Sequence, residues 1–217
     1  INALWYNALR VMDRLRVALG RTAVRGSEEP PDFQAMAESV RLQFRRRFWH
    51  DAGGYLFDVI DGPAGNDTSI RPNQIFALSL ESDLLTADQA RDVLKTVRTH
   101  LLTPYGLRTL SPGDPLYKGV YTGDPESRDA AYHNGTVWPW LFGPYLDAVR
   151  AVEGQGEART ELQRLLPALR AHLCDAGLGT ISEIFNANAP HDPKGCISQA
   201  WSVSEILRHV WGQDSLL

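Results

Sequence analysis

The sequence predicts an all-α protein built from helix pairs, arranged as part of an α/α toroid. Three observations lead to this prediction. Apolar residues recur at three- and four-residue spacing over most of the chain. Arg-rich amphipathic segments are each followed by a glycine with a bulky apolar residue, a polar loop and a nearly uncharged apolar segment. Helix pairs of this kind stack side by side and bury the apolar helix of each pair.

The periodicity predicts about seven helices, and short strands are expected at 55–60 and 107–110. Asp32 and Thr86 have side chains that can cap the helices that follow them, and Pro167 should kink the sixth helix. The expected helices span residues 1–22, 32–49, 73–85, 87–102, 137–152, 158–175 and 198–211. A closed toroid of six helix pairs would contain about twelve helices. Because only about seven are expected in this chain, we expect either an open solenoid arc or the C-terminal part of a closed barrel.

Composition excludes several classes of protein. The 217 residues are 43% hydrophobic and 22% charged, with a formal net charge of −4, so a nucleic acid is not expected as the main partner. No run of 18 apolar residues predicts a membrane span. Cys174 and Cys196 are too few for a disulfide framework, so we expect free thiols in a reducing compartment, namely the cytoplasm. No metal-ligand spacing or nucleotide-binding glycine pattern occurs, so no metal and no cofactor are expected.

Several of the six tryptophans and seven tyrosines stand beside Asn, Gln, His and Gly, a mixture typical of sugar-binding clefts; the alternative is an aromatic core with turns. The chain does not open with a Met, which predicts a fragment of a longer protein. Three segments would meet at one mouth of a toroid: 2–7, 128–140 and 181–202. A domain that spans residues 1–217 is expected.

Glu183 is the candidate catalytic residue because it lies between Ile181 and Ile184 in an uncharged context, where partial desolvation suits a general base. The alternative is that Glu183 caps the following helix or pairs with Arg128 or Arg71. His133 has an alternative too, as a buried histidine bound to a backbone carbonyl. The positions at loop-to-helix junctions predict that Glu183, His133 and Trp201 lie together.

Three strings resemble the C-terminal, amylo-α-1,6-glucosidase domain of glycogen debranching enzymes: Ile1–Leu9, Tyr132–Trp140 and Gly195–Ser202. The resemblance covers nearly the whole chain and implies a glucoamylase-like (α/α)6 barrel. It implies inverting hydrolysis with Glu183 as the base. The sugar site would include His133, Asn134, Trp138, Gln199 and Trp201. Segment 2–7 adds Asn2, Trp5 and Tyr6 as candidate substrate-binding residues, and the helix start at 71–74 adds Arg71 and Asn73.

Two departures from the family pattern matter. Asn134 stands where members of the family commonly carry Gln, which shortens the amide by one methylene. The general-acid aspartate of the family lies upstream of the string that starts at Ile1, so the acid is expected outside this chain and the isolated chain is expected to be inactive.

The resemblance therefore implies a glycogen-debranching hydrolase that acts on α-1,6-glucosyl branches of glycogen or a branched α-glucan oligosaccharide, together with the N-terminal part of the same protein. Two alternatives stay open: a related toroid glycosidase that acts on a small glucoside or mannoside, and a non-catalytic carbohydrate-binding or helical module. A partial toroid should also expose apolar residues at its flanks. The residues expected to be exposed are Leu4, Val11, Leu15, Val203, Ile206 and Val210.

Overall fold

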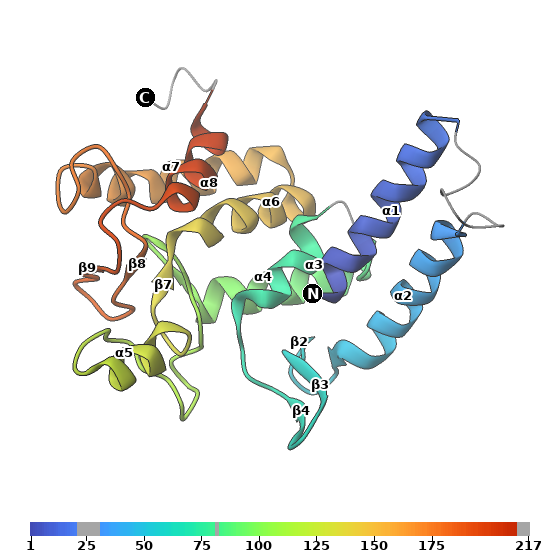
Figure 1. The fold of residues 1–217 in the computed structure, drawn as a ribbon, viewed down its shortest axis with the longest axis horizontal. Coiled ribbons are helices and arrows are strands. Elements are labelled where there is room, and N and C mark those ends of the chain that lie inside the picture. The colour runs from blue at the N-terminus through green and yellow to red at the C-terminus, as the bar shows by residue number, and fades with distance from the viewer. Residues whose placement is uncertain (21–30, 81–82, 212–217) are drawn as a thin grey trace.

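The computed structural model describes residues 1–20, 31–80 and 83–211 (Figure 1). Helices dominate this part of the chain. The α-helices are α1 (Asn2–Ala18), α2 (Phe33–Phe48), α3 (Phe76–Ser79), α4 (Ala87–His100), α5 (Pro125–Tyr132), α6 (Phe142–Glu153), α7 (Gln155–His172) and α8 (Ala200–Val210). The strands are β1 (Trp49–His50), β2 (Tyr55–Leu56), β3 (Val59–Gly62), β4 (Gly65–Asp67), β5 (Leu102–Thr103), β6 (Gly106–Arg108), β7 (Val137–Trp138), β8 (Ile184–Phe185) and β9 (Pro193–Lys194).

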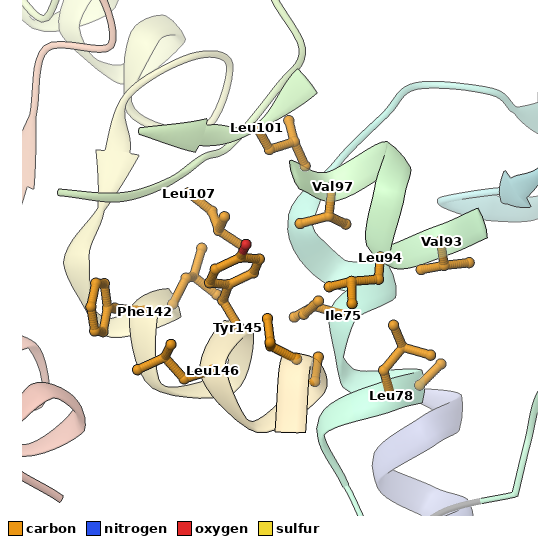
Figure 2. Close-up of a cluster of buried hydrophobic side chains, with 14 of the residues drawn as sticks. Ile75, Leu78, Val93, Leu94, Val97, Leu101, Leu107, Phe142, Tyr145 and Leu146 are labelled. Carbon is orange, nitrogen blue, oxygen red and sulfur yellow. The ribbon is translucent and has the colours of Figure 1, made fainter. Parts of the chain in front are cut away.

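The centre of the molecule is α6, which follows a 3₁₀ turn at Pro139–Leu141. All its residues from 142 to 149 are buried, as the prediction of an apolar inner helix requires. It packs against α3, α4, α7 and α8, and α8 also covers the 3₁₀ turn. Figure 2 shows Tyr145 of α6 on the side of the helix that faces Leu94 and Val97 of α4, whereas Phe142 and Leu146 lie on its other side. The charged helices α4 and α7 thus cover an apolar inner helix, which confirms the helix-pair arrangement.

The α1–α2 pair forms an arm at the opposite end of the molecule from α7 and α8 (Figure 1). Asp32 caps α2 as predicted, because its side chain accepts a hydrogen bond from the backbone N–H of Ala35 at 2.8 Å. On α1, Leu4 and Leu15 are about half exposed, at 47% and 48%, which confirms the expected apolar flank there. The predicted end of the first helix at residue 22 lies outside the described residues.

The expected exposure of α8 is wrong for two of its residues. Ile206 and Val210 are only 5% and 6% exposed, because α8 turns this face toward α6. The exposed apolar residues at this end are Trp201, Leu207 and Trp211. Val203 of α8 and Val11 of α1 are partly buried.

Two predicted helices are shorter than expected. The helix expected at 73–85 is a 3₁₀ turn at Pro72–Ile75 followed by α3, which ends at Ser79. Beyond it, the Arg45 side chain binds the backbone carbonyls of residues 83–85, including that of Leu84 at 2.7 Å, so these carbonyls need no helical partner. The helix expected at 137–152 starts only at Phe142, because residues 137 and 138 pair as β7 with β6 and β8.

Other boundaries agree more closely with the prediction. The α7 helix continues through Pro167, so the expected kink there does not end the helix and stays a prediction. As predicted, Thr86 caps α4, with a complete capping box between Thr86 and Gln89. The strand expected at 55–60 is divided into β2 and β3. The α5 helix was not predicted, although Asp124 caps it and Pro125 occupies its first turn, which are ordinary helix-start signals.

A small antiparallel sheet, in the order β5-β6-β7-β8-β9, joins the loops at one end of the helices. It was not predicted as a sheet. Gly106 permits the β6–β7 contact: its φ is +139°, and a Cβ there would lie 2.5 Å from the carbonyl oxygen of Trp138. Val137 of β7 pairs with Phe185 of β8, which brings the segments around residues 133 and 183 side by side.

Candidate active site

Glu183 lies directly before β8, and its backbone continues the β8–β9 ladder. Its N–H donates to the carbonyl of Cys196 at 2.9 Å. In return, the N–H of Cys196 donates to Glu183 Oε2 at 2.9 Å. Gly195 makes this approach possible, because its φ is +68° and a Cβ there would clash with Oε2. The strand pairing therefore fixes both the main chain and the carboxylate of Glu183.

The other carboxylate oxygen is bound by two more elements. The hydroxyl of Tyr132, the last residue of α5, donates to Glu183 Oε1 at 2.5 Å. The side-chain amide of Gln199, which precedes α8, lies 3.4 Å from the same oxygen. The backbone N–H of Gln199 is held in turn by the carbonyl of Ile181 at 2.9 Å. Three segments that are far apart in the sequence thus converge on one carboxylate.

These contacts decide the charge of the group. Partial burial raises the pKa of Glu183, but hydrogen bonds from Tyr132, Cys196 and Gln199 together outweigh burial and hold its pKa below the ordinary glutamate value. Glu183 is therefore ionised at neutral pH. Burial and the hydrogen bond to this carboxylate raise the pKa of Tyr132, so its phenol stays protonated and donates.

The sequence-based alternatives for Glu183 do not match its contacts. Within the described residues, no Lys or Arg forms an ion pair with Glu183. Arg71 has other partners, and the backbone donor to Glu183 is that of Cys196, outside α8. The carboxylate is partly buried, anionic and bound only by neutral donors, which is an environment suited to a general base.

Aromatic rings adjoin this carboxylate. His133 is exposed and stacks on Trp138, with ring centroids 5.7 Å apart and an interplanar angle of 10°. The Trp138 ring also meets Trp201 edge to face at 5.7 Å, and Tyr132 at 4.7 Å. Trp201 is 44% exposed. Glu183, His133 and Trp201 therefore belong to one cluster, as the sequence predicted, and the buried-histidine alternative for His133 is wrong.

Trp138 itself lies behind the exposed rings. It is only 5% exposed, and its indole N–H points to the carbonyl of Tyr132 at 3.1 Å and to Thr136 Oγ1 at 3.2 Å. The expectation that Trp138 stacks on substrate is corrected: the ring is covered by its neighbours, and the accessible ring surfaces are those of His133 and Trp201.

Arg71 and Asn134 bind each other and the backbone. Arg71 donates to the carbonyl of His133 at 2.7 Å, to that of Thr109 at 3.2 Å and to Asn134 Oδ1 at 2.9 Å. The amide N–H of Asn134 donates to the carbonyl of Ala130 at 2.8 Å. Both ends of the Asn134 amide thus have protein partners, so this pair is placed to hold the His133 loop, and contact of Asn134 or Arg71 with sugar stays a prediction.

Asn2 and Asn73 line a separate open cleft of 530 Å³, together with Asp58 and Phe76. Asn73 donates to Asp58 Oδ1 at 2.8 Å, and Arg71 lies 3.8 Å from the other oxygen of Asp58. Arg71 therefore joins this cleft to the His133 loop. A second connection runs through ring stacking of Phe76 on Trp140 at 5.9 Å and of Trp140 on Trp201 at 5.5 Å.

The two remaining candidates on α1 are not brought to this cluster. Tyr6 is 1% exposed, and its hydroxyl donates to Asp83, so Tyr6 is a core residue and the prediction that it contacts substrate is wrong. Trp5 is 49% exposed but does not line the cleft. Amphipathic spacing alone did not tell which side of α1 each residue occupies.

Sequence reasoning missed Tyr132 and Asp58. Tyr132 stands next to His133 inside one of the three strings that carry the family resemblance, so the signal was present there. Asp58 lies in an expected strand and has no local signal; its role follows from contacts with residues 71 and 73. Among the described residues, no group of His, Cys, Asp or Glu is arranged to hold a metal ion.

The fold and the site together describe a class of protein: a helical α/α array with an ionised carboxylate, aromatic rings and amides gathered at its loop end. The chain belongs to the amylo-alpha-1,6-glucosidase family, whose model matches residues 1–208. It is 25% identical over 200 residues to the glycogen debranching enzyme of Saccharomyces cerevisiae, a match that covers 83% of this chain and 13% of that enzyme.

Solved structures show the same fold. The neutral trehalase of Saccharomyces cerevisiae superposes with a TM-score of 0.72 and 15% identity, over 97% of this chain and 36% of that one. The mannosylglycerate hydrolase of Thermus thermophilus superposes with a TM-score of 0.66 and 17% identity, over 97% of this chain and 44% of that one. These are (α/α)6 toroid enzymes, so the fold is a partial helical toroid with small sheets added. In the described residues, no helix is both long and apolar enough to cross a bilayer.

Proposed function

We propose that this chain is the base-bearing part of an inverting glycosidase that removes α-1,6-linked glucosyl branches from glycogen or a branched α-glucan oligosaccharide. The main support is the ionised Glu183 carboxylate, bound by Tyr132, Cys196 and Gln199 beside the exposed rings of His133 and Trp201. The family membership and the yeast debranching relative point to the same chemistry.

In the proposed mechanism, Glu183 takes a proton from a water molecule as that water attacks the anomeric carbon. A second carboxyl group protonates the departing glycosidic oxygen from the opposite face of the sugar, and the two groups are about 6.5–9.5 Å apart in inverting enzymes. The acid is proposed to be an aspartate of the N-terminal part of the same protein. The lowered pKa keeps Glu183 ionised at neutral pH, the form in which a carboxylate can act as a base.

The binding roles divide in two. His133, Gln199 and Trp201 are proposed to meet the sugar at the base, while Asn2 and Asn73 offer amides in the adjoining cleft. The residues expected to shape this site from behind are Arg71, Asn134 and Trp138. We propose that the protein works in the cytoplasm without a cofactor, where the exposed Cys174 and Cys196 stay as the free thiols that the structure shows.

The test is hydrolysis by the full-length protein of a branched limit dextrin and of small α-glucosides and α-mannosides, followed by ¹H NMR of the first product. The proposal predicts release of β-glucose from the branched dextrin, because inversion changes the configuration of the α-linkage. Release of α-glucose, or faster turnover of a small glucoside or mannoside, would contradict it. Binding of the dextrin without turnover would indicate a carbohydrate-binding module.

The chain as given should not hydrolyse the dextrin, because it lacks the proposed acid. Purified residues 1–217 are compared with their own Glu183→Gln variant. Equal, background turnover is expected. Turnover clearly above that of the variant would show that a carboxyl group within this chain serves as the acid.

A further inference from the structure

We propose that Tyr132 is a positioning residue for the base: its hydroxyl holds Oε1 of Glu183 and fixes the orientation of the carboxylate that faces the attacking water. This inference rests on the proposed role of Glu183. It adds a residue that acts on the base and not on the sugar. The contact on which it stands is the 2.5 Å hydrogen bond between Tyr132 and Glu183.

The Tyr132 ring is held on several sides, so the hydroxyl has a defined position. Its centroid lies 4.7 Å from that of Trp138, 4.9 Å from that of His133 and 5.9 Å from that of Tyr121. Its carbonyl accepts hydrogen bonds from Thr136 Oγ1 at 2.7 Å and from the Trp138 indole at 3.1 Å. A donor fixed by packing orients its partner without losing side-chain freedom during the reaction.

The three donors to the carboxylate differ in how firmly they hold it. The backbone N–H of Cys196 fixes Oε2 at 2.9 Å, whereas the amide of Gln199 is 3.4 Å from Oε1 and contributes a weak bond. The phenol is therefore the principal constraint on Oε1. Without it, the carboxylate is free to rotate about its bond to Cγ while Cys196 still holds one oxygen.

The same bond favours the anionic form of Glu183, since an O–H donor to a carboxylate stabilises the charge. The titratable groups near the pair are the phenol of Tyr121, the imidazole of His133 and the thiol of Cys196. Within the described residues, no charged side chain pairs with Glu183. Loss of the phenol should therefore move the ionisation of Glu183 toward higher pH.

The first experiment measures the pH dependence of kcat/KM for a Tyr132→Phe variant of the full-length protein on branched dextrin. The acidic limb should move to higher pH, and kcat should fall about 10-fold with little change in KM, less than the 10²–10⁴-fold for loss of a general base. Tyr121→Phe is the matched control, because it removes a neighbouring phenol that does not bind Glu183. It should leave the acidic limb in place. An unshifted limb in Tyr132→Phe, or an equal shift in both variants, would overturn the proposal.

A second measurement needs no catalysis and no change at Tyr132. In the chain with ¹³Cζ-labelled tyrosine, the phenols of Tyr6, Tyr55, Tyr132 and Tyr145 should titrate at raised pH, since all four have raised pKa values. In Glu183→Gln one of them, that of Tyr132, should titrate at lower pH while the other three stay unchanged, because the coupling between two groups is reciprocal. An unchanged titration would overturn the contact itself. If the phenol does respond but Glu183→Gln stays fully active in the first assay, the contact stands, the role of Glu183 as base fails, and Tyr132 positions no catalytic group.

Discussion

Replacing Gly195 with alanine should displace the catalytic carboxylate while leaving the fold in place. Gly195 has φ +68°, and an added Cβ would lie closer to Glu183 Oε2 than van der Waals contact allows, and 3.1 Å from Glu183 Cβ. The left-handed backbone alone costs a non-glycine residue roughly 1–2 kcal/mol. The clash also forces Oε2 away from the N–H of Cys196, now at 2.9 Å, and a hydrogen bond to a charged group is worth about 1.5–3 kcal/mol.

A displacement near 1 Å of a group in the reaction can reduce the rate about 10²-fold. We therefore expect Gly195→Ala to lower kcat of the full-length protein on branched dextrin by about this factor, with a loss of roughly 2.5–5 kcal/mol in urea unfolding. Gly179→Ala is the matched control, since Gly179 has φ +74° but nothing within 4 Å of an added Cβ. It should lose about 1–2 kcal/mol and keep kcat. Equal kcat values for the two variants would refute the reasoning.

Three further predictions concern stability and chemical reactivity. Asp147 of α6 binds Arg208 of α8 at 2.5 Å and so joins the two helices. Asp147→Ala should therefore lower the free energy of unfolding in urea by about 1–3 kcal/mol, and a loss smaller than the error of the measurement would contradict this. Burial lowers the pKa of His172, against the opposing effect of the nearby Asp175. The free energy of unfolding should therefore decrease as pH falls below about 6.5, because the unfolded chain then binds a proton more readily than the folded one. This decrease should be smaller in His172→Gln, and equal pH profiles of the unfolding free energy in the two proteins would count against the prediction. Iodoacetamide should inactivate the full-length enzyme by alkylating Cys196, whose backbone N–H binds Glu183, and bound branched dextrin should slow this inactivation. Resistance of a Cys174→Ser variant to iodoacetamide would instead place the reactive thiol at Cys174.

Much of the site could be predicted because its residues occupy the same place in each helix pair. Trp201 lies in the first turn of α8, His133 follows α5 and Glu183 precedes β8, and a toroid gathers such loop positions at one end. The repeat therefore predicted that these residues converge, but not the sheet that carries Glu183.

Which of the site residues are exposed and which are bound to other parts of the protein could not be predicted in the same way. The bond between Arg71 and Asn134 joins positions that are far apart in the chain, so no local pattern records that both side chains are already occupied. Tyr6 and Trp5 are adjacent on one helix, yet one is buried and the other half exposed. Such differences depend on which neighbour covers each side of the helix.

The small sheet was missed for a related reason. The strands β5, β7, β8 and β9 have two residues each, too few for an alternating pattern to be visible in a sequence. Their pairing is determined by where the surrounding helices place the loops. The sheet nevertheless sets the position of Glu183, because β7 and β8 lie side by side.

The central claim is that Glu183 is the general base, and kcat of the Glu183→Gln variant of the full-length protein on branched dextrin tests it most directly. Glutamine keeps the shape, and its one oxygen can still accept a hydrogen bond from Tyr132 or from Cys196, but it cannot take a proton from water. Glu126→Gln is the control, because Glu126 is an exposed carboxylate on α5, the helix that presents Tyr132. A fall of about 10²–10⁴-fold in kcat for Glu183→Gln alone is expected, whereas wild-type turnover by Glu183→Gln would contradict the account.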